Sequence, residues 1–243
     1  MPKFLVPPDQ FKEETAWIKG QDARHILRVL RLKPGDTLTL TDGEGMDYDA
    51  RICRAENRTL TLKITACHRS KTESPLRLTV CCAMLKDKKM DRVIKHLIPL
   101  GIQQWVPFFC ERAIPTPDAG RLQKRMVRWQ AIAAASLKQC GRSCLVTLPS
   151  PLPFHQVLES SHGCHHKIIF WEKATTRLTG LAPVPGENSA IMLIGPEGGF
   201  TEKEIDMARE KGFQSFSIGP RILRAETAAI AATALVQHIL GDI

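Results

Sequence analysis

Residues 193–205 read LIGPEGGFTEKEI, and in them an apolar run meets a helix-like run through a turn rich in glycine and proline. The apolar run, AIMLI (190–194), has the length of a buried strand, and TEKEIDMAREKG (201–212) has the periodicity of a helix. A second turn of this kind, SIGPRILRAET (217–227), follows another strand-like run. Repeated strand–turn–helix units are typical of an α/β fold.

The segments after Pro75 alternate between strand-like and helix-like patterns, which predicts an α/β domain with a mostly parallel sheet. The expected strands are 76–85, 102–109, 166–172, 190–195 and 213–219, and the expected helices are 86–101, 118–140, 201–212 and 225–240. The apolar residues expected to face inward on the first two helices are Met90, Val93, Ile94, Leu97 and Ile98, then Leu122, Met126, Trp129 and Ala133. Gly101 is the expected end of the first helix.

The N-terminal region has a different pattern. Apolar and polar residues alternate in DTLTL (36–40) and TLTLKIT (59–65), with DGEG and AEN as turn signals and a helix expected at 22–31. Short alternating strands at close spacing predict a small β-barrel. TESP (72–75) has the composition of a linker. We therefore expect two domains, a barrel at 1–71 and an α/β domain at 75–243.

The composition is that of a globular protein, with 43% hydrophobic and 24% charged residues in a chain of 243. No apolar run approaches the ~18 residues of a membrane-spanning helix. The N-terminal MPKFLVPPDQFKEET lacks the apolar core of a signal peptide. The expected location is the cytoplasm, with no membrane partner.

Eight cysteines occur without any C-x-x-C spacing. In a reducing compartment most are expected to be small buried hydrophobic residues. The segment HGCHH (162–166) contains metal-ligand types, but they are too crowded to close a tetrahedral site alone. No metal is expected.

The net charge of +9 is concentrated in one segment. Residues 75–145 contain 13 Lys or Arg against 4 Asp or Glu, whereas the flanking regions are nearly balanced. This excess is either an ordinary solvated surface or a footprint for a polyanion, of which nucleic acid is the commonest in a cell.

The two glycine-rich turns are expected to lie at the carboxyl ends of strands, where open α/β sheets bind ligands. Glycine lets the backbone approach a ligand closely, so the turns can form a slot for a flat heterocycle such as adenine. A Walker loop is absent, and Glu197 inside the turn repels a pyrophosphate. A neutral or cationic ligand such as S-adenosylmethionine suits the slot. The alternative is a turn without ligand, with Thr201 and Glu204 forming a capping box.

The pairing of LIGPEGGFTEKE with SIGPRILRAETAAIAA resembles the RsmE family of ribosomal RNA small-subunit methyltransferases, in the SPOUT superfamily. PKFLV, HILRVLR, PGD, KDKKMDRVI and RWQAIAAASLKQCGR follow the family's order. The resemblance implies S-adenosylmethionine-dependent methylation of a uridine at N3 in 16S ribosomal RNA. It also implies a PUA-like barrel, a SPOUT domain with a deep trefoil knot, and a homodimer.

The resemblance also implies the site residues. Those implied to bind the cofactor are Phe170, Trp171, Leu193, Ile194, Gly195, Glu197, Gly198, Gly199, Ile218, Gly219, Ile222, Leu223 and Arg224. Arg224 and Glu226 are the catalytic candidates, although Arg224 can instead pair with Glu226 or Glu197, and Glu226 can simply complement a helix dipole. Those implied to contact RNA are Arg24, Arg28, Arg31, Gln139, Arg142 and Arg221.

Two segments depart from the family pattern: Pro99-Leu100-Gly101 stands in place of Glu-Leu-Gly, and AAASLK (133–138) lacks the usual acids. Three alternatives therefore stay open. They are an inactive RNA-binding module, a methyltransferase acting on a different RNA nucleotide, and an enzyme that uses ATP or NAD.

Overall fold

The computed structural model describes residues 3–56, 58–86, 88–114 and 117–243, and these divide into two compact units. The first unit comprises Met1–Glu73 with Leu137–Leu145, and the second comprises Ser74–Ser136 with Val146–Ile243. Residues 137–145 thus join the first unit although they lie far along the chain. The domain limits 1–71 and 75–243 stay a prediction.

The first unit contains a six-stranded sheet in the order β1-β4-β5-β6-β3-β2. Its elements are β1 Lys3–Leu5, a 3-10 turn at Pro8–Gln10, β2 Phe11–Lys12, β3 Thr15–Lys19, α1 Gly20–Arg28, β4 Thr37–Thr41, β5 Met46–Glu56 and β6 Thr59–Arg69. β1 pairs with β4 in parallel and the other pairs are antiparallel. Alternate residues such as Leu38, Leu40, Leu60 and Leu62 are buried, as their pattern predicts. The AEN turn includes Asn57, which lies outside the described residues.

Segment 137–145 is held to the first unit by a buried polar cluster. Glu73 accepts hydrogen bonds from the Arg142 side chain (2.7 Å) and from the Ser143 backbone N–H (2.6 Å). The Ser143 hydroxyl donates to Asp47 (2.6 Å), and Lys3 Nζ donates to Asp47 (2.8 Å). Burial alone raises the pKa of Glu73, but its hydrogen bonds, first those from Arg142, outweigh burial and hold that pKa below its ordinary value.

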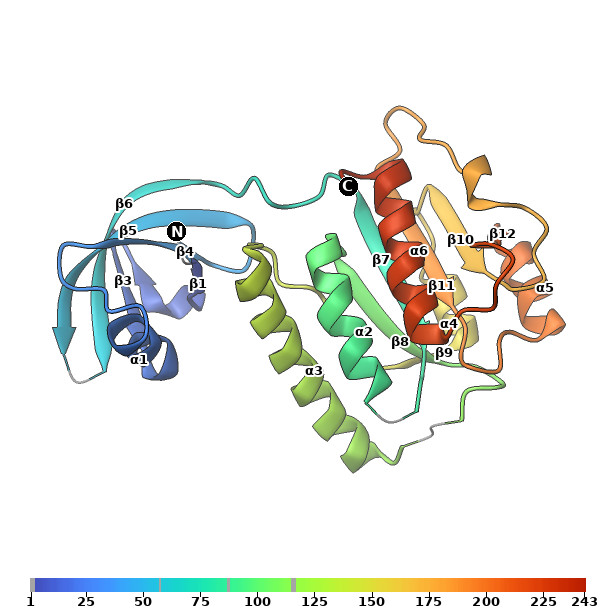
Figure 1. Ribbon diagram of the computed structural model, residues 1–243, viewed down its shortest axis with the longest axis horizontal. Helices are drawn as coiled ribbons and strands as arrows, with labels where there is room; N and C mark the ends of the chain where they lie inside the picture. Colours follow the sequence, from blue (N-terminus) through green and yellow to red (C-terminus); the bar gives the residue numbers. More distant parts are fainter. Residues whose placement is uncertain (1–2, 57, 87, 115–116) are drawn as a thin grey trace. The chain divides into compact units, whose positions relative to one another are not determined.

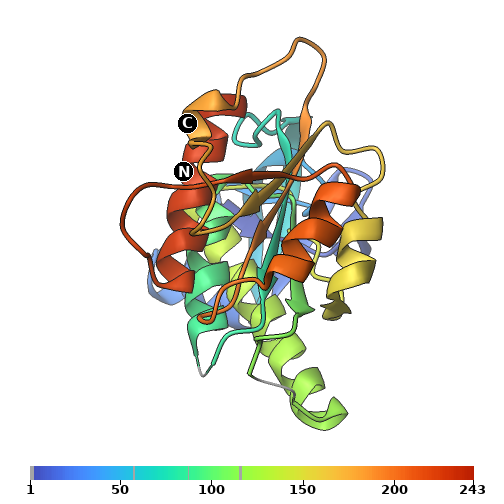
Figure 2. The same cartoon turned by 90° about the vertical axis from the view of Figure 1, so that its right-hand side faces the viewer.

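The second unit is a three-layer α/β sandwich (Figures 1 and 2). Its six-stranded sheet has the order β12-β10-β11-β7-β8-β9, and all its pairs are parallel. The strands are β7 Arg77–Ala83, β8 Gln104–Phe109, β9 Leu152–Pro153, β10 His166–Phe170, β11 Ser189–Ile194 and β12 Gln214–Phe216. The helices are α2 Lys89–Leu97, α3 Ala119–Cys140, α4 Phe154–Glu159, α5 Glu202–Glu210 and α6 Ala225–Leu240, with 3-10 turns at Ile98–Leu100 and Leu178–Gly180.

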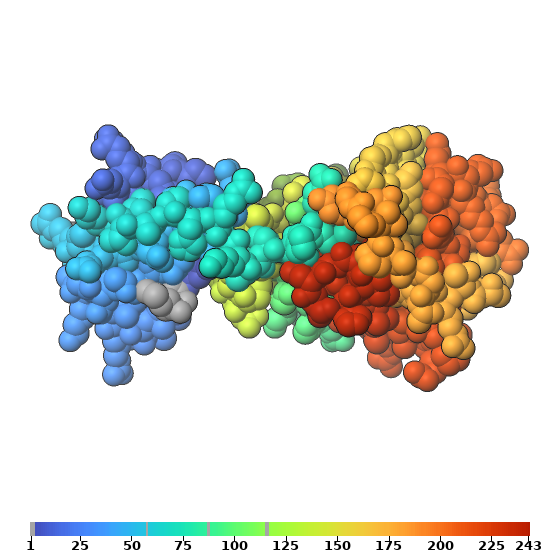
Figure 3. Space-filling view, turned by 90° about the horizontal axis from the view of Figure 1, so that it is seen from above, coloured from blue at the N-terminus to red at the C-terminus, as the bar shows by residue number. Residues whose placement is uncertain are grey.

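Helices cover both faces of this sheet. On one face α4 and α5 bury an apolar cluster that includes Phe108, Phe154, Leu193 and Phe200. α2 and α6 lie on the other face (Figures 1 and 2), where the Trp129 ring of α3 packs edge-on against the Trp105 ring of β8 (5.2 Å between centroids). In the space-filling view the end of α6, in red, reaches the surface beside the orange loop that precedes β11 (Figure 3).

The predicted helices and strands of this unit are present. Met90, Val93, Ile94, Leu97 and Ile98 are all buried. Gly101 ends the 3-10 turn that follows α2, with a φ of 79° that favours glycine. α2 begins at Lys89, later than predicted, and Asp87 lies outside the described residues. The sequence did not predict α4, β9 or the first three strands of the chain, because these segments are short and their apolar residues show no clear period.

The prediction that most cysteines are buried is wrong, because Cys110, Cys140, Cys144 and Cys164 are only partly buried, and Cys53 and Cys67 are exposed on β5 and β6. Both lie on the solvent side of their strands, where alternation places every second residue. Cys81 and Cys82 of the central strand β7 are buried. None of the helices described is both long and apolar enough to cross a bilayer.

Candidate functional site

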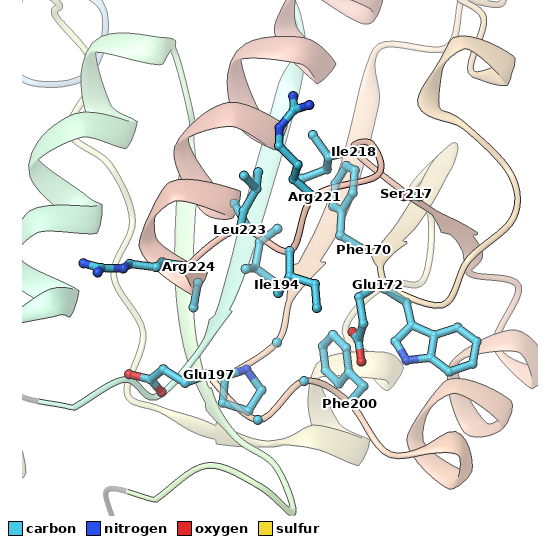
Figure 4. A pocket seen from close by; sticks show the side chains of 18 of the residues that line it. Phe170, Glu172, Ile194, Glu197, Phe200, Ser217, Ile218, Arg221, Leu223 and Arg224 are labelled. Atoms are coloured by element: carbon cyan, nitrogen blue, oxygen red, sulfur yellow. The ribbon is translucent and has the colours of Figure 1, made fainter.

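A cavity of about 520 Å³ opens at the carboxyl ends of β10, β11 and β12 (Figure 4). Its lining residues are Lys89, Phe170, Trp171, Glu172, Ile194–Phe200, Phe216–Ala225 and Ala228. We refer to this cavity as the strand-end pocket. β10 lies between β11 and β12, so the two glycine turns do not follow adjacent strands, and residues at the end of β10 complete the wall between them.

The first turn, residues 194–200, is shaped by close contacts that leave little room for side chains. A Cβ on Gly195 would lie 3.1 Å from the Phe200 ring, and a Cβ on Gly199 would lie 2.9 Å from the Glu172 carboxylate. Gly199 also has a φ of 67°, which favours glycine. The predicted capping box is present: the Thr201 hydroxyl accepts from the Glu204 N–H, and Glu204 accepts from the Thr201 N–H (2.9 Å). The turn therefore caps a helix and lines a pocket at once.

The second turn, residues 217–224, forms the opposite wall. The Gly219 N–H donates to the Ser217 hydroxyl (3.3 Å), which fixes the start of the turn. Leu223 points toward Ile194 across the pocket (Figure 4), whereas the Ile222 side chain is 87% exposed. Arg224 is the N-cap residue of α6. Apolar side chains from both turns thus form a slot with exposed backbone, which suits a flat ring.

Lys89 is the cation of the pocket that sequence reasoning missed. Its Nζ donates to Glu197 Oε1 (2.9 Å) and lies 3.8 Å from Glu226 Oε2. The hydrogen bond to Glu197 raises the pKa of Lys89. Burial alone raises the pKa of Glu197, but the bond from Lys89 outweighs burial and lowers it. Both groups are therefore charged at neutral pH, and the ion pair ties the first turn to the start of α2.

Arg224 does not take the structural role considered above. Among the described residues its guanidinium forms no ion pair with Glu197 or Glu226, since Lys89 occupies that position. Glu226 is buried, and its Oε2 has no hydrogen-bond partner among the described residues. Glu226 does not line the strand-end pocket, and Lys89 separates the two.

The pocket contains nearly all of the residues implied to bind the cofactor. Those that line it are Phe170, Trp171, Ile194, Gly195, Glu197, Gly198, Gly199, Ile218, Gly219, Ile222, Leu223 and Arg224. Leu193 is a correction: it is fully buried in the core cluster with α4 and α5. Strand alternation directs Leu193 to the face opposite Ile194, so its side chain cannot reach the pocket.

The residues implied to contact RNA fall into three groups. Arg24, Arg28, Arg31 and Gln139 are exposed. Arg221 is exposed on the pocket itself. Arg142 is a correction, because its side chain is 3% exposed and pairs with Glu73. Arg142 anchors segment 137–145 and cannot present its guanidinium to RNA in this structure.

Sequence reasoning missed Lys89 and Glu172 as pocket residues. Lys89 stands in the basic run KDKK, which reads as surface charge, and Glu172 directly follows the strand-like HKIIFW. A carboxylate just past a strand of the parallel sheet was the available signal for Glu172. The described residues contain no group of three metal-ligand side chains, including at HGCHH.

The pocket can bind a molecule with a flat apolar ring and a polar or cationic end. Phe170, Ile194 and Leu223 supply apolar walls, and Glu172 supplies a carboxylate, whereas Glu197 is paired with Lys89. About 520 Å³ lies within the usual range for a small-molecule cofactor.

Comparisons with known proteins agree with this geometry. Residues 72–237 match a family described as an RNA methyltransferase domain, and residues 18–65 match an RNA methyltransferase PUA domain. These matches, with the parallel sheet and its strand-end pocket, define the class: RNA methyltransferases that carry a PUA domain.

Comparison with individual relatives identifies the family within this class. A ribosomal RNA small subunit methyltransferase E from Synechocystis is 31% identical over 98% of this chain and 78% of its own length. Crystal structures of such an enzyme from Neisseria gonorrhoeae bound to S-adenosyl methionine (31% identity, TM-score 0.88) and of a methyltransferase from Legionella pneumophila with bound SAM (28%, 0.86) cover all of this chain and 99% of theirs. The chain belongs to the ribosomal RNA small subunit methyltransferase E, or RsmE, family.

Proposed function

We propose that this chain methylates N3 of a uridine in 16S ribosomal RNA, with S-adenosylmethionine as the methyl donor. Its family membership supports the activity, and the relatives' names supply the ribosomal substrate. The observation that carries the proposal is the strand-end pocket, because two glycine turns leave an adenine-sized slot with carboxylates at its edge.

The residues present fit this cofactor. Ile194, Leu223 and Phe170 suit the adenine ring, and the Glu172 carboxylate suits a polar or cationic group of the cofactor. When bound, the cofactor supplies an electrophilic methyl group on a positively charged sulfur. The protein contributes alignment and charge stabilisation, which are its usual means of accelerating a displacement.

Arg224 is the proposed source of charge stabilisation. As N3 of the uridine loses its proton, negative charge spreads to O2 and O4 of the base. The Arg224 guanidinium stands at the pocket edge beside Glu197 (Figure 4) and has no ion-pair partner among the described residues. A cation already in place for that charge lowers the barrier without reorganisation.

Glu226 is the proposed proton acceptor in the same site. Its buried Oε2 has no hydrogen-bond donor among the described residues, and a buried acceptor without a partner is unusual. Lys89 lines the pocket and its Nζ lies 3.8 Å from Glu226 Oε2, so the Lys89 ammonium would donate one proton to Glu226 as it accepts the proton that leaves N3 of the uridine. An unchanged single-turnover methylation rate in Glu226→Gln would argue against this role.

RNA binding is proposed for Arg24 and Arg28 on α1, for Arg31, for Gln139 and for Arg221. Exposed arginines on one helix face contact phosphates, and each phosphate contact adds to the salt dependence of binding. The Arg24→Ala, Arg28→Ala double variant is expected to lower the slope of log affinity against log salt by about 1–2. Filter binding of a 16S rRNA fragment at several salt concentrations measures it, with Arg54→Ala on β5 as a control. An unchanged slope would remove α1 from the interface.

A homodimer is part of the same proposal, and the resemblance to the family is its main support. Ile222 is an 87% exposed aliphatic residue at the edge of the strand-end pocket, close to which the resemblance implies the subunit interface. Light scattering is expected to give twice the chain mass of 27.1 kDa, and Ile222→Asp is expected to shift the population toward the monomer. A monomer at micromolar concentration in the unmodified protein would refute this part.

The deep trefoil knot, the closed barrel and a cytoplasmic location also belong to the proposal. The sheet order β12-β10-β11, in which β10 precedes β11 but lies between β11 and β12, is compatible with a threaded chain. An experimental structure in which the chain near the 217–224 turn does not pass through a loop would contradict the knot.

Two measurements test the activity. Calorimetry with S-adenosylmethionine, ATP and NAD is expected to detect only the first, which separates this proposal from an inactive RNA-binding module and from nucleotide-dependent enzymes. Mass mapping of 16S rRNA from cells with and without the protein identifies the modified nucleotide. A missing methyl group elsewhere than on a uridine N3 would reassign the target.

A further inference from the structure

The Glu172 side chain is exposed on the wall of the strand-end pocket, where it has no protein partner among the described residues. Among the described residues no hydrogen bond or ion pair engages it, whereas Glu197 is already paired with Lys89. Figure 4 shows Glu172 between Phe170 and Phe200, across the pocket from Arg224. The two carboxylate oxygens of Glu172 are therefore available to accept hydrogen bonds from a ligand in the pocket.

The backbone fixes this orientation. The Trp171 N–H donates to the Phe216 carbonyl (3.1 Å), which extends the pairing of β10 with β12 past Phe170. The Trp171 ring packs against the core cluster, with the Lys173 and Arg209 cations 5.8 and 5.9 Å from its centroid. The chain turns directly after β10, where the Ala174 N–H donates to the Trp171 carbonyl (3.1 Å), and this turn places Glu172 on the pocket wall with Phe170.

Gly199 makes room for this carboxylate. A Cβ at Gly199 would lie 2.9 Å from Glu172 Oε1 and 3.1 Å from Oε2. Any other residue at 199 would displace both oxygens, in addition to straining a backbone whose φ is 67°. The Gly199 backbone and the Glu172 side chain therefore form one edge of the pocket together.

We propose that Glu172 binds the ribose 2′- and 3′-hydroxyls of the cofactor, an inference that rests on the proposed function. The two oxygens of a carboxylate match the two donors of a cis-diol, and acids just past a strand of an open α/β sheet take this role in other nucleotide sites. The ribose adjoins adenine, and Glu172 adjoins the apolar slot at Phe170. The methyl-transfer end then lies toward Arg224, on the far side of Ile194 and Leu223.

The test compares three ligands by isothermal titration: S-adenosylmethionine, S-adenosylhomocysteine, which lacks the methyl group and positive sulfur, and 5′-methylthioadenosine, which lacks the amino acid. Glu172→Ala is expected to weaken all three by a similar factor, roughly 10- to 100-fold, because all three carry the diol. The control is Glu202→Ala, an exposed acid that pairs with Lys173 and does not line the pocket. It is expected to change none of the three affinities.

The pattern across ligands decides the outcome. Loss for the first two ligands but not for 5′-methylthioadenosine would assign Glu172 to the amino-acid ammonium and overturn the proposal. Loss for S-adenosylmethionine alone would assign it to the sulfonium, and no loss at all would remove Glu172 from binding. If the unmodified protein binds none of the three, the proposed function itself fails. The melting temperature of Glu172→Ala should be unchanged, because no protein contact is lost.

Discussion

Arg224→Ala is expected to lower the rate of RNA methylation by roughly 10²–10³-fold, the usual cost of removing one charge-stabilising donor. The affinity for S-adenosylmethionine is expected to stay largely unchanged. The reason is the placement of the side chain, which stands beside Glu197 at the pocket edge and points away from Phe170 and Ile194 (Figure 4). Single-turnover methylation of 16S rRNA fragments, together with calorimetry, measures both quantities.

Two further variants sharpen this prediction. Arg224→Lys keeps the charge and should recover part of the lost rate, whereas Lys211→Ala removes an exposed cation that does not line the pocket and should change neither quantity. An unchanged turnover in Arg224→Ala would remove Arg224 from the mechanism. An equal loss of cofactor affinity and rate would make it a binding residue instead.

Glu73→Ala is expected to destabilise the first unit by about 3 kcal/mol, because it leaves the Arg142 guanidinium buried without its carboxylate partner. The Arg142 side chain is 3% exposed and that of Glu73 is 17% exposed. The backbone N–H groups of Ser143 and Cys144 lose the same acceptor. Hydrogen exchange of peptides from β5 and β6 measures the stability of the first unit separately from that of the second. We expect the most protected amides of these peptides to exchange about 100-fold faster in the variant.

The same group predicts how stability depends on pH. The folded pKa of Glu73 lies below the ordinary value of 4.5, so protonation favours the unfolded chain. Its contribution is fully present above about pH 4.5 and is lost as the pH falls through the folded pKa. Glu73→Ala should therefore flatten the acid limb of the stability curve for the first unit.

The control for this prediction is Glu56→Ala. Glu56 pairs with Arg54, but both side chains are more than half exposed, so the change should cost less than about 1 kcal/mol. If Glu73→Ala costs no more than Glu56→Ala, the buried pair does not hold segment 137–145.

Much of the fold and of the site could be predicted from the sequence, because in long segments the periodic spacing of apolar residues indicates which side chains are buried. α6 has the limits expected for it, and the four apolar residues of α2, with Ile98 just after it, are buried as their spacing requires. The strand-end pocket followed from two glycine turns, since few sequences other than ligand-binding turns place so many glycines between a strand and a helix.

What could not be predicted depends on tertiary contacts. Arg142 resembles a surface arginine in sequence, and only the approach of Glu73, far away in the chain, shows that it is buried. Lys89 is one of several lysines in a basic run. Only its position in the structure, with Nζ 2.9 Å from Glu197 Oε1, shows that this lysine is the one in the pocket. Leu193 was predicted in the pocket together with Ile194, but neighbouring strand residues point to opposite faces of the sheet, and only Ile194 lines the pocket.

Segment 137–145 also limits how this protein can be dissected. A fragment ending at Glu73 omits the Arg142 and Ser143 partners of Glu73, Asp47 and Lys3, so it exposes charged groups that the intact chain buries. A gene fusion that grafts the first unit onto another enzyme must therefore carry a second, distant peptide. Evolution meets the same restriction, since recombination at a single point would separate the two pieces.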